Sequence, residues 1–474
     1  MRNHFPTISV FALLTTTLLP MLSAAQPADR STTRTRHQQL AREIFKELIE
    51  INTSLNVGST RAAEAMAARL RSAGFPETDV HLVGPQPKHM NLVARYRGNS
   101  ALPSILFIGH LDVVDALRQD WSFDPFTFFE KDGYFYGRGT SDMKGDDACL
   151  IANLIRLKQE GFVPNRDLII ALTEDEENGD ANGVKWLLEN RRDLIDAEFC
   201  INPDGGSGEI KEGRHAVMEV QTSEKLYLDF RLEARDKGGH SSLPVKENAI
   251  YRLAGALTRL SQYEFPIRLN ETTRMFFRRI AAQATGQTKA DLLAVAGVPP
   301  DTAATHRLAS SSPFYNAMMR TTCVATMLQG GHAENALPQR AYANVNCRML
   351  PDDTVESVLA TLKAVVADTQ ITVTYAHAPS PAPPSPLRRD VLGPLEKLTE
   401  SMWPGVIVVP VMSTGGSDGR LLRAAGIPVY GISGMFVDMD DIRAHGKDER
   451  LGVNEFYEGV EFMYRLIKAL ASES

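Results

Sequence analysis

The stretch from residue 105 to residue 147 restricts the possible folds of this 474-residue sequence more than any other. It opens with the apolar run 105–108, which a glycine, His110 and Asp112 follow at once. A short apolar run that ends in polar residues is typical of a buried strand with functional side chains at its end. Asp142 follows thirty residues later, in the glycine-bracketed loop GRGTSDMKGD before a helical segment. The stretch therefore predicts one half of a metal site.

Carboxylates also follow two later strands of the predicted fold. The run 167–172 stops at TEDEENGD, which contains Glu176 and Glu177, and the run 198–201 stops at NPDGG, which contains Asp204. Helices with apolar residues at helical spacing are expected at 35–51, 59–73 and 146–160. Alternating helices and strands indicate an α/β layer, and open α/β sheets place their ligands where strands end.

The sequence changes character after Lys225, where six elements are expected in the order strand, helix, strand, strand, helix, strand. They lie at 226–235, 248–263, 321–328, 341–349, 354–367 and 371–375. This is the order of a split βαβ, ferredoxin-like sandwich. A partly helical excursion, 266–319, interrupts it, and the sequence does not indicate its role.

A proline-rich linker at 378–386 ends this region, and the α/β pattern then returns with the strand 406–412 and the loop STGGSDG. We therefore predict an α/β catalytic domain with an inserted α+β (βαββαβ) domain. The expected boundaries are 1–25 for a signal peptide, 26–222 and 379–474 for the two parts of the catalytic domain, and 223–378 for the insertion.

The first 25 residues have the features of a cleavable export signal. An early arginine precedes an apolar core at 8–22, and Ser23, Ala24 and Ala25 form a small-residue cleavage site. An uncut membrane anchor is the weaker alternative, because the apolar run is short and contains a proline. We expect a periplasmic or secreted protein without a stable membrane anchor.

Composition narrows the expected partners. Hydrophobic residues make up 43% of the chain and charged residues 23%, as in soluble globular proteins. The formal net charge of −7 gives no electrostatic basis for binding nucleic acid or an anionic membrane. A peptide or another small molecule is therefore the expected substrate.

The four cysteines are too few for a disulfide framework, and they have no metal-binding spacing. Cys323 and Cys347 lie in strand-like runs placed symmetrically about residue 335, so they can face each other. An exported protein would allow them to form a bridge. Two separate buried thiols are an equally good interpretation.

Five residues have the chemistry to ligate two divalent metals, namely His110, Asp142, Glu177, Asp204 and the late His445 in IRAHGKDERL. Such a centre needs a bridging carboxylate and further N or O ligands on each side. The set contains no thiolate, which favours a catalytic zinc site over a structural one. Each residue alone is explained as well by a polar element end or a solvated loop, but the five together are not.

The motifs GHLDVV, YGRGTSDMKG, EDEENG, GGHSSLP and AHGKDER, together with the strand-end Asp204, resemble a known family in their order and separation. It is the two-zinc exopeptidase family of carboxypeptidase G, aminoacylase, acetylornithine deacetylase and succinyl-diaminopimelate desuccinylase. The resemblance covers essentially the whole mature chain. It implies a zinc-exopeptidase-type catalytic domain, two Zn2+ per subunit and a homodimer formed through the inserted lid.

The resemblance also implies a role for each ligand. His110, Asp142 and Asp204 would hold one zinc. Asp142, Glu177 and His445 would hold the other, with Asp142 shared as the bridge.

Four neighbouring carboxylates have different expected roles. Asp112 would accept the imidazole N–H of His110 and fix its tautomer. Glu176 would be the general base that takes a proton from a metal-bridging water and later delivers it to the leaving amine. Glu174 and Asp175 are expected to be flanking solvated carboxylates.

Five residues match positions that contact the substrate in the family. His240 in GGHSSLP matches a histidine that reaches the active site of the partner subunit and stabilises the oxyanion. Asn335 and Arg348 match positions that hold the substrate, and Arg348 would clamp a free carboxylate; a surface arginine on an edge strand is the alternative. Gly415 and Gly416 match a loop beside that carboxylate, for which a simple turn is the alternative.

We therefore expect an exported zinc-dependent metallopeptidase, a carboxypeptidase or dipeptidase, that hydrolyses an amide bond adjacent to a free carboxylate. A metal-bridged hydroxide would attack the amide, with Glu176 as the base. An N-acyl-amino-acid deacylase with the same mechanism is the second candidate. A non-catalytic binding protein on the same fold is the third, although it would be expected to lack the base or a ligand.

Overall fold

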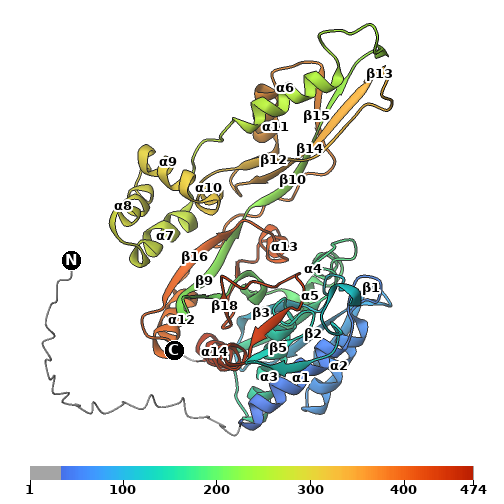
Figure 1. Cartoon of the computed structure of the whole chain (residues 1–474). Helices are drawn as coiled ribbons and strands as arrows, with labels where there is room; N and C mark the ends of the chain where they lie inside the picture. Colours follow the sequence, from blue (N-terminus) through green and yellow to red (C-terminus); the bar gives the residue numbers. More distant parts are fainter. Residues whose placement is uncertain (1–33, 473–474) are drawn as a thin grey trace, which may run out of the picture. The chain divides into compact units, whose positions relative to one another are not determined.

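The computed structural model describes residues 34–472, so the predicted signal peptide lies outside the described residues (Figure 1). Across 34–472, none of the helices combines the length and the apolar character needed to cross a membrane.

A six-stranded sheet carries the strand ends that the sequence singled out. Its order is β1 (Val80–Gln86), β2 (His89–Tyr96), β6 (Arg166–Thr173), β3 (Leu102–His110), β7 (Phe199–Ile201) and β17 (Val429–Tyr430). β3 pairs in parallel with both β6 and β7, so these three strands end at the same edge of the sheet. The predicted α/β layer is confirmed.

Helices cover both faces of this sheet, as a sheet with parallel strands requires. Ile105 and Phe107 of β3 lie in one apolar cluster, and Leu106 and Ile108 lie in another, as expected for side chains that alternate along a strand. The first cluster includes α1 (Arg36–Glu50), α2 (Thr60–Ser72), α3 (Lys144–Gln159), α12 (Arg389–Met402) and α14 (Val453–Ala471). The second includes α4 (Gly183–Asn190), α5 (Arg192–Ile195) and α13 (Gly419–Ala424).

A second sheet joins the parts of the chain on either side of the insertion. Its order is β16 (Ile407–Ser413), β9 (Arg214–Glu224), β8 (Gly208–Lys211) and β18 (Phe436–Asp438), and β9 pairs in parallel with β16. The excursion forms α7 (Glu271–Ile280), α8 (Gly286–Val295), α9 (Thr302–Ser311) and α10 (Pro313–Met319). Its apolar residues pack against Val409 and Val411 of β16, so the excursion covers this sheet.

The ferredoxin-like region follows the predicted element order. Its elements are, in chain order, β10 (Leu226–Arg235), α6 (Ala249–Ser261), β12 (Thr322–Gly330), β14 (Arg340–Met349), α11 (Val355–Val366) and β15 (Ile371–Tyr375). The four strands form an antiparallel sheet in the order β12, β14, β10, β15. Leu228, Phe230 and Leu232 point into the core with α6 and α11, whereas Tyr227 on the other face is exposed. The alternation read from 226–235 is therefore confirmed, while the domain boundaries stay a prediction.

Cys323 of β12 lies opposite Cys347 of β14, and the two sulfur atoms form a disulfide. The interpretation of these residues as two separate thiols is therefore wrong. Cys149 and Cys200 are free and buried.

Candidate functional site

Three of the five predicted ligands lie at the carboxyl ends of parallel strands. His110 is the last residue of β3, Glu177 follows β6, and Asp204 lies in the 3-10 turn Pro203–Gly205 after β7. Asp142 comes from the loop before α3, and His445 from the loop before β19 (Arg450–Gly452). Residues that are far apart in sequence are therefore delivered to one edge of the sheet.

Asp142 lies between the two histidines. Its Oδ1 is 3.1 Å from His110 Nε2, and its Oδ2 is 3.0 Å from His445 Nε2. His445 Nε2 is also 2.9 Å from Glu177 Oε1. The ligand atoms of His110, Asp142 and Glu177 lie within 4.8 Å of one another and could hold a metal ion. Each oxygen of Asp142 thus faces a different histidine, which is the arrangement a bridging carboxylate needs.

The charges at this edge favour a cation. Burial by itself would lower the pKa of His110, but its hydrogen bond to Asp142 and the charges of Asp112, Asp142 and Asp204 raise it well above its ordinary value. Burial, opposed in part by His110 and reinforced by Asp142, raises the pKa of Asp204 to about 8. A buried carboxyl that holds a proton can be neutralised by a divalent cation instead, so the charges of this donor set fit metal ions.

The orientation of His110 differs in one detail from the prediction. His110 Nδ1 is 3.0 Å from the backbone carbonyl oxygen of Asp112 but 3.6 Å from its carboxylate. The Asp112 carboxylate instead accepts the backbone N–H groups of Glu176 and Glu177, each at 3.1 Å. Asp112 therefore fixes the imidazole with its main chain and the loop after β6 with its side chain.

Glu174 and Asp175 are not solvated carboxylates, and that prediction is wrong. Each is only 1% exposed. Glu174 accepts the backbone N–H of Ser59 at 2.9 Å and pairs with His89, and Asp175 accepts the backbone N–H of Ala181. Both hold the loop in place, because buried carboxylates need such partners.

Glu449 is a site residue that the sequence reasoning missed, although it stands in the motif AHGKDER. It is fully buried and forms an ion pair of 2.7 Å with Arg138. Its carboxylate also accepts the backbone N–H groups of Gly139, Ser141 and Asp142 at 2.9, 2.8 and 3.1 Å. Glu449 therefore ties the loop of His445 to the loop of the bridging carboxylate.

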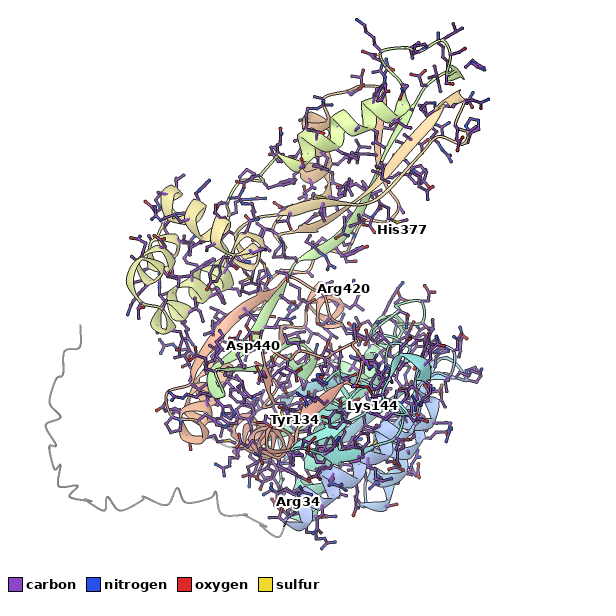
Figure 2. The ribbon with its side chains drawn as sticks, viewed as in Figure 1. Arg34, Tyr134, Lys144, His377, Arg420 and Asp440 are labelled. Carbon is purple, nitrogen blue, oxygen red and sulfur yellow. A yellow bond between two sulfur atoms is a disulfide. The ribbon has the colours of Figure 1, made fainter. Side chains whose placement is uncertain are left out.

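Lys144 anchors the other end of the Asp142 loop (Figure 2). Its ammonium donates to the carbonyl oxygens of Leu48 and Ile51 at the end of α1, both at 2.9 Å. The start of α3 is thereby fixed to α1, because a basic side chain can satisfy the carbonyl oxygens at the end of a helix.

The loop with Gly415 and Gly416 is exposed, but the residues after it are buried. Ser417 donates from its backbone N–H and its hydroxyl to Glu224, at 2.8 and 2.9 Å, and Glu224 is paired with Arg423. A buried ion pair at the end of β9 therefore sets the position of this predicted substrate loop.

The predicted substrate residues of the insertion fall into two groups. His240 in β11 (Gly239–His240) and Asn335, next to β13 (Ala336–Leu337), adjoin each other, because Ser241 N–H donates to the Asn335 carbonyl oxygen at 3.0 Å. The imidazole of His240 is exposed, and its Nδ1 is 2.7 Å from Ser242 Oγ. Arg348 on β14 is half-buried and lies over the ring of Tyr227. No hydrogen bond or ion pair within 34–472 joins these side chains to the five ligands, so their roles stay predictions.

Comparisons with known proteins show the family to which this chain is similar. Residues 106–469 match the sequence profile of "Peptidase family M20/M25/M40". The human N-fatty-acyl-amino acid synthase/hydrolase PM20D1 is 30% identical over 380 residues, which are 78% of this chain and 74% of that protein. The probable carboxypeptidase S-like 2 of Dictyostelium discoideum is 28% identical over 83% of this chain and 77% of its own length.

A solved structure from the M20 family has a similar fold. The M20 family metallo-carboxypeptidase Sso-CP2 from Sulfolobus solfataricus superposes with a TM-score of 0.66 at 16% identity. The match covers 91% of this chain and 99% of that protein.

Proposed function

The chain belongs to peptidase family M20/M25/M40 and is a metallo-hydrolase, and on this premise we propose that it hydrolyses an amide bond next to a free carboxylate. The position of Asp142 between His110 and His445 carries the proposal. Two imidazole nitrogens and several carboxylate oxygens, without a thiolate, suit two catalytic zinc ions. When bound, zinc would supply Lewis-acid chemistry, polarising the scissile carbonyl and activating water.

Glu176 is proposed as the general base. Its backbone is held by Asp112, so its side chain starts from a fixed position beside the ligand Glu177. Burial, followed by the charges of Asp204 and Asp418, raises its pKa to about 10. Divalent cations beside it would lower this pKa again, and the ionised carboxylate could then take a proton from water and deliver it to the leaving amine.

A carboxypeptidase or dipeptidase is the first candidate activity, and an N-acyl-amino-acid deacylase is the second. The second is supported by the human relative, whose name gives N-fatty-acyl amino acids as its substrates. Both activities need a group that binds the free carboxylate, and Arg348 has the chemistry for it.

Two further properties belong to the proposal. Export is supported by the features of residues 1–25 and by the disulfide of Cys323, since disulfides persist in oxidising compartments. A homodimer is supported by β12, an edge strand on which Val324 and Leu328 are 60% and 65% exposed. Exposed apolar edge strands invite pairing with a second copy.

The test incubates the chain with zinc and a mixed panel of dipeptides, longer peptides and N-acyl amino acids, and identifies products by mass spectrometry. We expect cleavage next to a free carboxylate, loss of activity after chelation and recovery with zinc. Full activity in metal-free protein, or cleavage only of substrates that lack a free carboxylate, would overturn the proposal.

A further inference from the structure

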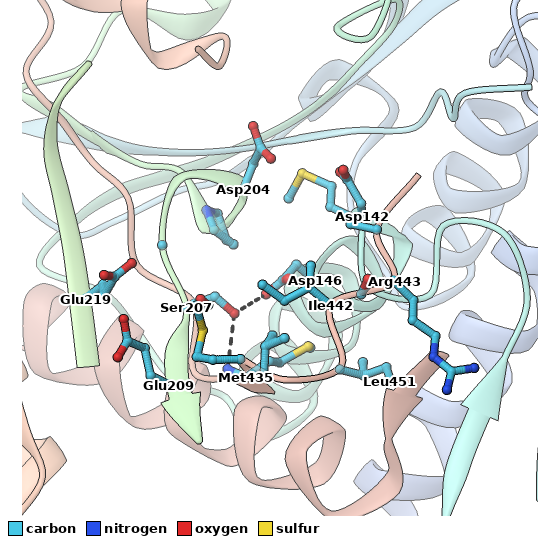
Figure 3. A pocket seen from close by; sticks show the side chains of 18 of the residues that line it. Asp142, Asp146, Asp204, Ser207, Glu209, Glu219, Met435, Ile442, Arg443 and Leu451 are labelled. Atoms are coloured by element: carbon cyan, nitrogen blue, oxygen red, sulfur yellow. Dashed lines mark hydrogen bonds between the residues drawn. The ribbon is translucent and has the colours of Figure 1, made fainter. Parts of the chain in front are cut away.

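A cavity of about 450 Å3 opens beside two of the metal ligands (Figure 3). Asp142 and Asp204 form part of its rim, and Glu209 and Glu219 lie at another side. Its volume is within the range of about 300–1,000 Å3 that is usual for small-molecule sites. A substrate bound at the metal ligands therefore has this space directly beside it.

Most of the cavity wall is apolar. Met143 follows Asp142, and Met439 and Ile442 lie in the loop that carries His445. Met435 adds a side chain from just before β18. Phe314 of α10 adds an aromatic ring, so the excursion that covers β16 also reaches this cavity. Flexible methionine side chains adapt to apolar groups of different shape.

The other side of the cavity is acidic. Glu209 and Glu219 lie on the neighbouring strands β8 and β9, and Lys211 pairs with Glu209 at 2.6 Å. Burial, followed by the charge of Glu209, raises the pKa of Glu219 to about 8. A chain that ends in a methyl group would remove water from these carboxyls, and buried polar groups without partners are unfavourable. The acidic pair therefore limits how far an apolar chain can enter.

The cavity lies on one side of the reacting bond. The predicted carboxylate-binding residues Asn335, Arg348, Gly415 and Gly416 do not line it. A substrate whose carboxylate is held by those residues, and whose amide lies at the ligands, can therefore direct the group on its carbonyl side to the cavity.

We propose that this cavity is a specificity pocket for an apolar group on the carbonyl side of the scissile amide, with Glu209 and Glu219 setting its depth. The inference rests on the proposed function and adds the class of acyl group to it. The apolar group is the acyl chain of an N-acyl amino acid or the side chain of the residue before the bond.

The test uses one amino acid acylated with linear chains from acetyl to dodecanoyl. Because each buried methylene contributes about 0.8 kcal/mol, kcat/KM is expected to rise about fourfold per methylene and then level off at one chain length. Met439→Trp fills the pocket from a side chain that is 42% exposed and should remove this rise. Leu293→Trp on α8, where the side chain is 47% exposed, is the matched control and should keep it.

Glu219→Leu should move the levelling-off point to longer chains, and the conservative Glu219→Gln should leave it in place. A kcat/KM that does not depend on chain length would overturn the proposed pocket. So would a dependence on chain length that Met439→Trp leaves unchanged. A 6-aminohexanoyl substrate cleaved tenfold faster than the hexanoyl one would also overturn it, because the acidic pair would then select a cation.

Calorimetric binding of the same series to Glu176→Gln separates the two proposals. Affinity that rises with chain length, without hydrolysis by the unsubstituted enzyme, overturns the proposed function and supports the pocket. Hydrolysis together with affinity that ignores chain length overturns the pocket and supports the function.

Discussion

Asp112 Oδ2 accepts the backbone N–H of Glu177 at 3.1 Å, so a residue beyond the end of β3 fixes a ligand that follows β6. Asp112→Asn would turn an amide group toward backbone donors and release this loop. Loss of such support typically costs about 10–100-fold in metal affinity or activity. Competition with a chelator should reveal weaker zinc binding, while Asp115→Asn, an exposed neighbour, should bind zinc as the unsubstituted protein does.

Glu449→Gln tests the connection between the two ligand loops. The substitution leaves Arg138 buried without its anion, and breaking a buried pair in this way costs about 3–5 kcal/mol of stability. Denaturant unfolding should give this loss, and zinc titration should give weaker binding by the folded protein. Glu189→Gln, at an exposed position on α4, is the control. Unchanged zinc affinity would remove Glu449 from the site and leave it a structural role alone.

Glu176→Gln separates catalysis from metal binding. Because Glu176 is not one of the predicted ligands, the variant should keep its zinc and its substrate affinity. Loss of a general base typically lowers kcat by about 10^2–10^4-fold. Mass spectrometry checks that the variant keeps its metal, and kcat on the best substrate checks the loss of catalysis. Equal activity in the variant would contradict the role of Glu176 as the general base.

Lys225 makes stability depend on pH. Burial, followed by the charge of Arg348, lowers its pKa to about 7, whereas an unfolded lysine titrates near about 10.4. Between these values the unfolded chain binds more protons than the folded chain, so stability rises with pH. The free energy of unfolding should rise less from about pH 7 to pH 9.5 in Lys225→Met than in the unsubstituted protein. Equal changes in the two proteins would contradict the low pKa of Lys225.

His240 gives a test of the dimer. If it acts in the partner subunit, His240→Ala and Glu176→Gln should each be nearly inactive alone. A mixture of equal amounts that exchange subunits should recover about a quarter of full activity, because half of the dimers then contain one complete site. No recovery after confirmed exchange would place the role of His240 within its own subunit or remove it.

The sequence predicted that His110, Glu177 and Asp204 lie together because each follows a short apolar run, and parallel pairing brings the ends of such strands together. Asp142 and His445 come from loops, and the sequence predicted them from the motifs around them. The sequence did not predict β9. Its 11 residues include charged and polar side chains, and its parallel partner β16 lies beyond the insertion. Glu449 was missed because its partners are backbone N–H groups from a distant loop, and no sequence period marks such contacts. The packing of the excursion could not be predicted from the sequence, because the surface that it covers includes strands from both sides of the insertion.

The hydrogen bond from Ser141 N–H to Glu449 joins residues 308 positions apart. At about 5–20 residues per second of synthesis, the loop of Asp142 is made roughly 15–60 seconds before Glu449, which binds it. A chain shorter than 449 residues therefore lacks the contacts that join the two ligand loops. Because Glu449 and His445 come late in the sequence, the predicted ligand set is complete only near the end of translation.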